Sequence, residues 1–276
     1  LFLSSGRIDA KSAARGLGIG LAYTMLFGLG SISSSVYTGR LSGVIGDPNA
    51  AGFMFVTVGL VAFSVIEKRK YRIMFFGLIV FSSLLTYSRT TLLALIVATA
   101  WGFLGRRLPL WGIATVAPMA AYVLGKLVDE LKSVGPWADR EGSDLLRERI
   151  NVQENLTIDQ SPWIGNGPGT AHVNLGSDQA EVFFFFHNSY LAMICEGGRI
   201  ALTLFITLAI SLIGRFGLMP PERRSPWREA AFIALLIVGM SLGEVFFAIP
   251  GAIVIGMTMA PKDPPPDSFR FGSPRG

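Results

Sequence analysis

The chain has 276 residues, of which 51% are hydrophobic and only 16% charged, and its mean hydropathy is +0.50. Soluble globular domains are usually about a quarter charged, so the composition excludes an ordinary soluble protein and indicates an integral membrane protein. The net charge of +5 does not call for a nucleic-acid partner, because basic loops in a membrane protein usually report its topology.

Apolar runs close to the roughly 20 residues that cross a bilayer follow one another along the chain. The last run is too long for one straight helix and contains Gly243, Glu244 and Pro250, so we expect it to form two spans broken near Gly243. We therefore predict an all-α fold, a polytopic transmembrane helical bundle of about eight helices with one large extracytoplasmic loop. The runs are residues 17–37, 50–66, 71–87, 90–104, 108–128, 187–214 and 228–260.

These spans divide the chain into four expected parts. Residues 1–128 would hold about five N-terminal transmembrane helices, and residues 129–186 the extracytoplasmic loop. Residues 187–261 would hold about three C-terminal helices, and residues 262–276 a proline-rich cytoplasmic tail. With this topology, 16 of the 24 basic residues lie on the cytoplasmic side, as the positive-inside rule requires. The opening "LFLSSGRIDAKSAARG" resembles the middle of a longer chain, so we expect further spans upstream.

The large loop has two recognisable segments. Residues 143–156 place apolar side chains near helical spacing, which predicts a short amphipathic helix. The following "DQSPWIGNGPGTAHVNLG" is rich in glycine and proline and predicts a turn. Its "GNGPG" lacks the GxGxxG spacing and any following Gly-Lys-Ser/Thr, so a phosphate-binding loop is not expected there.

Several charged or titratable residues lie on the extracytoplasmic side, where the topology rule does not explain them. Arginine suits bidentate binding of phosphate oxygens, and an imidazole with a pKa near neutrality suits proton transfer. If these residues meet at the outer surface, they form a cationic patch beside one imidazole. They are Arg40, Arg89, Arg140, Arg147, Arg149 and His187, of which His187 follows four phenylalanines at the start of an apolar run.

Plainer interpretations remain open for each of these residues. The Arg89 side chain could simply reach toward lipid head groups, with no role in binding a substrate. Arg147 and Arg149 could belong to a solvated helix face and pair with Glu141 and Glu148.

The two histidines and one further charge pair also have structural interpretations. His187 could be an interfacial residue without chemistry, and His172, in the glycine-rich turn, is expected to be structural. Glu196 and Arg199 are three residues apart on one predicted helix and could neutralise each other.

Four motifs occur in an order that resembles the O-antigen ligase family, which also contains O-antigen polymerases and related exopolysaccharide enzymes. They are "GRLSGVIGDPNAAG", "TYSRTTLLAL", "SPWIGNGPGT" and "HNSYLAMICEGG", and the resemblance extends over roughly residues 36–260.

The resemblance implies a metal-independent glycosyltransferase of the bacterial inner membrane, with its active site facing the periplasm and no cofactor. The donor would be a glycan on undecaprenyl diphosphate, and the acceptor a lipid A core sugar or another glycan, with membrane lipid around the site and no nucleic acid. His187 would be catalytic, and Arg89 with Arg147 or Arg149 would bind the diphosphate, assisted by Arg40. The supporting residues would be Asn188, Glu196 and Asn49.

Three other functions stay open. An O-antigen or exopolysaccharide polymerase of the same family would use the same residues on a different acceptor. A polysaccharide or lipid transporter should place charges near the bilayer midplane and show inverted repeats; only Glu196, Arg199 and Glu244 fit the first condition, and no repeat is visible. An inactive membrane subunit is the third.

Overall fold

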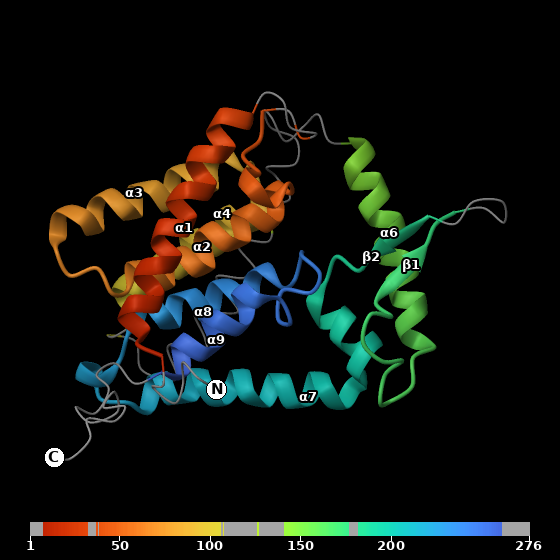
Figure 1. Ribbon diagram of the computed structural model, residues 1–276. Helices are drawn as coiled ribbons and strands as arrows, with labels where there is room; N and C mark the ends of the chain where they lie inside the picture. The colour runs from red at the N-terminus through yellow and green to blue at the C-terminus, as the bar shows by residue number, and fades with distance from the viewer. Residues whose placement is uncertain are drawn as a thin grey trace, which may run out of the picture.

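The computed structural model describes residues 8–32, 37, 39–105, 107, 126, 141–176 and 182–260. These residues are mostly helical, as predicted, with one two-stranded antiparallel sheet and two short 3-10 turns (Figure 1). The α-helices are α1 (Ala10–Ser31), α2 (Pro48–Phe63), α3 (Arg69–Leu85), α4 (Arg89–Leu104), α6 (Glu141–Asp159), α7 (Ser189–Leu218), α8 (Pro226–Val238) and α9 (Ile249–Met259); the strands are β1 (His172–Asn174) and β2 (Phe183–Phe185), and the 3-10 turns are Gly43–Ile45 and Pro221–Arg223.

Side-chain caps explain where three of these helices begin. Asp9 accepts hydrogen bonds from the backbone of Lys11 and Ser12 at the start of α1. Asp47 accepts from Ala50 N at the start of α2, and Asn188 accepts from the second and third residues of α7. Such caps satisfy backbone donors that have no partner within the helix. Asn188, expected to support the site, therefore fixes the start of α7.

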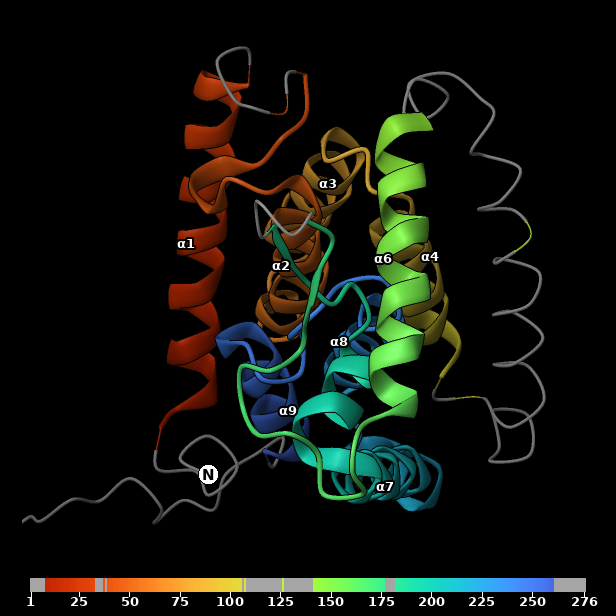
Figure 2. The same ribbon diagram turned by 90° about the vertical axis from the view of Figure 1, so that its right-hand side faces the viewer.

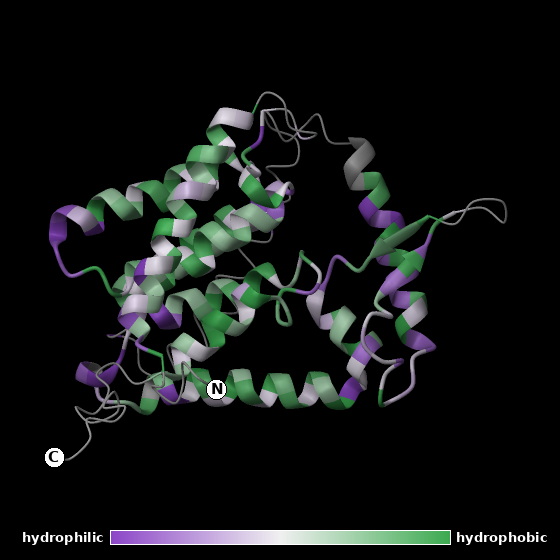
Figure 3. Ribbon diagram, viewed as in Figure 1, coloured by the Kyte–Doolittle hydropathy of each residue, from purple (hydrophilic) through white to green (hydrophobic). Residues whose placement is uncertain are grey.

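The apolar side chains are distributed in a way that fits a membrane protein. Helices α2 and α8 form the centre and are buried around most of their circumference. The outer helices also expose large apolar side chains, among them Ile19 and Leu26 of α1, Ile73 of α3 and Leu204 and Ile210 of α7. Figure 3 shows hydrophobic residues along most of the length of α7. Contiguous exposed apolar surface on this scale indicates contact with lipid or a partner rather than with water.

In the described part of the chain, one helical segment, Ser189–Phe216, is long and apolar enough to cross a membrane. Three apolar helices, Pro48–Phe63, Arg89–Leu104 and Ile249–Met259, are shorter. Each predicted span contains a helix except 108–128, which apart from residue 126 lies outside the described residues, as does the tail 262–276. The polytopic topology therefore stays a prediction.

The helix ends gather in two groups. At the first, which we call the loop end, Leu41 N donates to Leu85 O, and Ser189 N donates to Gly239 O. At the second, the basic end, Lys11 forms an ion pair with Glu67, and the Trp227 ring packs on Phe103. Helix α6 and the β-hairpin lie at the loop end (Figures 1 and 2). The chain thus passes back and forth between the two ends.

The C-terminal region shows one confirmed break and one that was not predicted. The predicted break near Gly243 is present, because α8 ends at Val238 and α9 begins at Ile249, with Glu244 at φ 58° between them. The run 187–214, however, does not form one straight helix, since α7 is broken at Gly198 (φ 74°, ψ 178°). This combination is accessible essentially only to glycine.

Candidate functional site

His187 lies at the loop end, between the last residue of β2 and the start of α7. Its backbone N–H donates to Glu154 Oε1 at 2.6 Å, which ties the junction to α6. The neighbouring phenylalanines form a strand rather than a helix: Phe183 and Phe185 are exposed, Phe184 is half-buried, and they pair with β1. Consecutive strand residues point to opposite faces, which explains this alternation.

The connection between α8 and α9 supports the same junction from its other side. Ser189 Oγ donates to Leu242 O and accepts from Val245 N. Gly243 lies so close to the chain that a Cβ atom there would be 1.9 Å from Phe186 O. The break in the C-terminal region therefore brings backbone against the residue that precedes His187.

The surroundings of His187 favour its neutral form. Burial lowers the pKa of the imidazole below its ordinary value of 6.5, and the positive charge of Arg147 lowers it further, whereas the Phe185 carbonyl and the Asp47 carboxylate act in the opposite direction. Its Nδ1 atom is buried without a hydrogen-bond partner among the described residues. A neutral imidazole can accept a proton, as a general base does.

Glu154 is the site residue that the sequence did not indicate. Its side chain is 0% exposed, and Oε2 has no hydrogen-bond partner in the described part of the chain. Burial raises the pKa of this carboxyl, while the hydrogen bond from His187 N lowers it. Glu154 lies within the predicted amphipathic helix, where an acidic residue is expected on the solvated face, so only the tertiary contact distinguishes it.

The glycine-rich turn docks on the break in α7. Asn166 N and Gly167 N donate to the carbonyl oxygens of Cys195 and Glu196 at 2.7 and 2.9 Å. These are carbonyl groups at a helix end, which require partners from elsewhere. A Cβ atom added at Gly198 would lie 1.9 Å from Trp163 O, and one added at Gly165 would lie 2.3 Å from Glu196 O. Neither side of the contact therefore has room for a side chain. The turn thus caps the helix end at the break in α7.

Glu196 and Arg199, for which a mutual pair was one open interpretation, do not pair with each other in the structure. Glu196 Oε1 accepts instead from Gly169 N at 2.9 Å, and the Arg199 guanidinium lies over the Trp163 ring, 5.3 Å from its centroid. Both side chains face the docked turn, because the break at Gly198 changes their relative orientation from that of a regular helix. His172 is structural here, in β1 against the Phe183 ring.

Arg40 joins two of the resembling motifs. Its Nε donates to Thr86 O at 2.9 Å, and Nη2 donates to Asn49 Oδ1 at 3.2 Å. Thr86 lies in the turn before α4, and α4 begins at Arg89, which is only 9% exposed. Arg40 and Asn49 therefore fix the position of the turn that carries Arg89.

Residues 74–206 match the sequence model of a protein family described as O-antigen ligase. Residues 74–206 are therefore similar to the O-antigen ligase family. The resemblance seen in the four motifs is thereby confirmed for the three that fall in this range. No curated protein and no solved structure shows significant similarity to the chain.

The O-antigen ligase match contains most of the predicted site. Arg89, Arg147, Arg149, His187, Asn188 and Glu196 lie within it, together with Glu154, whereas Arg40 and Asn49 precede it. This similarity supports a membrane protein that processes bacterial glycans, an enzyme at that coarse level, with glycan and lipid-linked substrates in general.

The structure distinguishes the two loop arginines of this O-antigen ligase domain. Both lie on α6, but Arg147 is half-buried and within electrostatic range of His187, while Arg149 is exposed. Arg140 lies outside the described residues. No cluster of three or more His, Cys, Asp or Glu side chains that could hold a metal ion occurs in the described ranges, and metal independence stays a prediction.

Proposed function

We propose that the protein transfers a glycan from undecaprenyl diphosphate to an acceptor hydroxyl at the periplasmic face of the bacterial inner membrane. The observation that carries this proposal is His187, whose pKa is lowered by burial and by the charge of Arg147, and whose backbone N–H is hydrogen-bonded to the buried Glu154. It occurs in the range similar to the O-antigen ligase family, at the loop end, which the topology of basic residues assigns to the periplasm.

In the proposed reaction the acceptor oxygen attacks the anomeric carbon of the donor glycan, and the bond from that carbon to the diphosphate oxygen breaks. His187 takes the proton of the acceptor hydroxyl, and undecaprenyl diphosphate leaves with the bonding electron pair. The new glycosidic bond forms with inversion. A neutral imidazole meets the requirement for a proton acceptor.

The arginines would stabilise the departing diphosphate. Fixed guanidinium groups in a partly buried site offset developing negative charge without reorganising. Arg89 and Arg147 are the arginines we assign to this role, because Arg89 is only 9% exposed at the start of α4 and Arg147 is half-buried within electrostatic range of His187. Arg40 has two nitrogens bonded to the protein, so we assign it to positioning Arg89.

The domain division follows from the same proposal. Residues 1–128 and 187–261 would form the membrane helices, residues 129–186 the periplasmic loop and residues 262–276 a cytoplasmic tail. The described part of the loop consists of α6, the docked turn and the β-hairpin, and these three elements place Glu154 and Arg147 against the start of α7.

A glycan profile in living cells tests the function. A strain that lacks the gene would be complemented with wild type, His187→Ala or the control His172→Ala, and surface and lipid-linked glycans would be separated on gels. We expect wild type and His172→Ala to restore surface polymer and His187→Ala to fail. Long chains left on the lipid carrier would identify a ligase, and single repeat units a polymerase. Restoration by His187→Ala would contradict the catalytic role of His187.

A further inference from the structure

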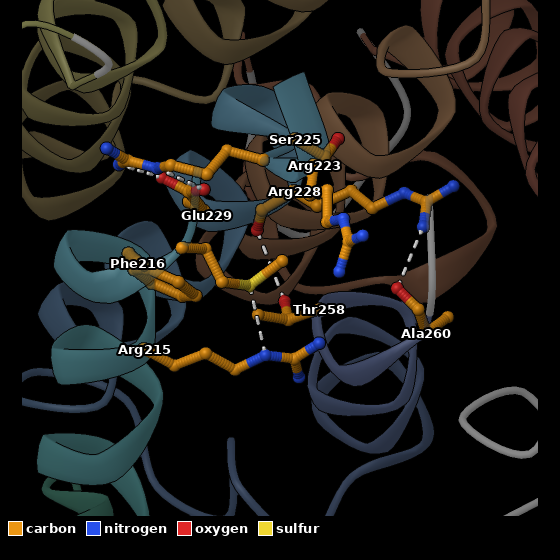
Figure 4. Close-up of a pocket in the computed structure, with 10 residues that line it drawn as sticks. Arg215, Phe216, Arg223, Ser225, Arg228, Glu229, Thr258 and Ala260 are labelled. Carbon is orange, nitrogen blue, oxygen red and sulfur yellow. Dashed lines mark hydrogen bonds and ion pairs between the residues drawn. The ribbon is translucent and has the colours of Figure 1, made fainter. Parts of the chain in front are cut away.

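The basic end of the molecule contains a cavity of about 450 Å³ (Figure 4). It lies between the end of α7, the turn Pro221–Arg223, the start of α8 and the end of α9. The straight part of α7 separates it from His187, and at about 1.5 Å per residue the 20 residues after Gly198 span roughly 30 Å. The charged residues in its lining are Arg215, Arg223, Arg224, Arg228 and Glu229.

The single acidic side chain in this lining is already neutralised. Glu229 accepts from Arg224 Nε and Nη2 at 3.0 and 2.6 Å, and it also accepts from Trp101 Nε1 at 3.1 Å. Both members of the pair are 4% exposed. Such a bidentate, buried pair is a fixed structural unit, so the positive charge of the other lining arginines is not reduced by Glu229.

The other three guanidinium groups extend toward the side of the cavity where Ala260 lies, away from Glu229 (Figure 4). Arg215 Nε contacts only a weak acceptor, Met219 Sδ at 3.2 Å. Arg228 Nη1 lies 3.5 and 3.4 Å from the carbonyl oxygens of Met257 and Ala260. Within the described residues no carboxylate lies within ion-pair distance of Arg215 or Arg223. Clustered like charges in a concave site attract an anion.

The positive-inside rule alone does not account for this arrangement. That rule requires basic residues near the membrane but not inside a cavity. Lys68, Arg69 and Lys70 meet it at the same end as exposed residues, as does Arg223, whereas Arg228 is 5% exposed and Arg215 is half-buried. The cavity wall thus contains two arginines, Arg215 and Arg228, that are partly or fully withdrawn from solvent.

We infer that this cavity binds the phosphate group of an anionic phospholipid in the membrane leaflet opposite His187. Arginine forks match phosphate oxygens, and the wall also contains the apolar Phe216 and Met219. Exposed Leu204 and Ile210 extend along α7 from this point, which provides a surface for an acyl chain. The inference rests on the membrane placement proposed above but not on the transfer reaction, and the cavity lies beyond residues 74–206 of the family match.

Native mass spectrometry of the full chain tests this inference. The protein would be released from nanodiscs of phosphatidylglycerol or of phosphatidylcholine, with and without inorganic phosphate. We expect retained phosphatidylglycerol and about tenfold weaker retention in Arg215→Gln/Arg223→Gln, since two charge-assisted contacts are lost. Both residues lie outside the Arg224–Glu229 pair, so folding should persist. The control Arg69→Gln/Lys70→Gln removes the same charge from the same end and should retain the lipid.

The outcomes separate the possible ligands and the two proposals. Equal retention of phosphatidylcholine, or equal loss in the two double variants, would overturn a specific site. Displacement of the lipid by millimolar inorganic phosphate would show that a free phosphate compound is the ligand and would overturn the lipid assignment. His187→Ala should abolish glycan transfer and leave lipid retention unchanged, so failure of either proposal is visible without the other.

Discussion

The backbone N–H of His187 donates to a carboxylate oxygen of Glu154, 33 residues earlier in the chain, at 2.6 Å. The bond joins the start of α7 to the middle of α6, and Glu154 is fully buried. A buried carboxylate is costly unless it is hydrogen-bonded, so this contact fixes the helix of the loop against the entry to α7. Two predictions follow from its chemistry.

Two substitutions of Glu154 should distinguish the contribution of its hydrogen bond to stability from that of its charge. Glu154→Gln keeps an oxygen that can accept from His187 N and removes a desolvated charge, so its stability should equal or exceed that of wild type. Glu154→Ala leaves the buried N–H without a partner and should cost about 1–3 kcal/mol. Thermal unfolding in detergent measures both. A less stable glutamine variant would show that the charge itself stabilises the fold.

The pH dependence of transfer should follow the pKa of His187. Since burial and Arg147 both lower this pKa from its ordinary value of 6.5, the imidazole should protonate at a lower pH than a free histidine, and the acid limb of the rate profile should lie below pH 6.5. Arg147→Gln removes a cation and should move the limb to higher pH, whereas Arg149→Gln, the matched control, should not. Rates measured in detergent with a lipid-linked donor test this. If the acid limb of the rate profile lies at the same pH in Arg147→Gln as in wild type, His187 is not the group whose titration limits the rate.

The break in α7 should be sensitive to substitution at one glycine and insensitive at another. Gly198→Ala occupies a conformation reserved for glycine and collides with Trp163 O, so it should lose at least about 1–3 kcal/mol and undock the turn. Gly214→Ala, in the same helix with open space around it, should be neutral or slightly stabilising. Protease sensitivity of residues 161–170 reports docking, and an undisturbed turn in Gly198→Ala would contradict this account.

Arg40 and Asn49 should be energetically coupled. Their side chains are hydrogen-bonded, and Arg40 also holds the turn before Arg89. In a double-mutant cycle with Arg40→Gln and Asn49→Ala, we expect a coupling energy of about 0.5 kcal/mol or more. Unfolding in detergent provides the four free energies, and additive effects would show that the bond does not contribute to stability.

Single-cysteine labelling tests the topology. The only native cysteine, Cys195, is buried, so a Cys195→Ala background is suitable. Glu148→Cys, exposed on α6, should react with a membrane-impermeant reagent in intact spheroplasts, whereas Lys70→Cys at the basic end should react only after lysis. The reverse result would place His187 in the cytoplasm and contradict the proposed function.

Some helices could be predicted closely from hydropathy, whereas α1 (Ala10–Ser31) begins seven residues before the predicted run 17–37 and ends six residues before its end. The contacts between the helices could not be predicted. The runs 71–87 and 90–104 correspond to α3 and α4 within about two residues, because an apolar run of that length has few alternatives to a helix. Three of the four phenylalanines form strand β2, which could not be predicted because identical residues have no periodicity that distinguishes strand from helix. The break at Gly198 depends on the turn that docks on it, about 30 residues earlier in the chain. The burial of Glu154 depends on the strand that packs against α6. Neither can be derived from local sequence.

The docking of residues 161–170 on the break in α7 has a consequence for protein engineering. The hydrogen-bond donors and acceptors of this contact, and the two glycines that approach the opposite backbone, Gly165 and Gly198, are divided between the loop before α7 and the first turns of α7. A chimera that exchanges only the loop between two members of the family would separate complementary halves of one joint. Recombination points for such chimeras therefore belong after Gly198, so that loop and helix entry are inherited together.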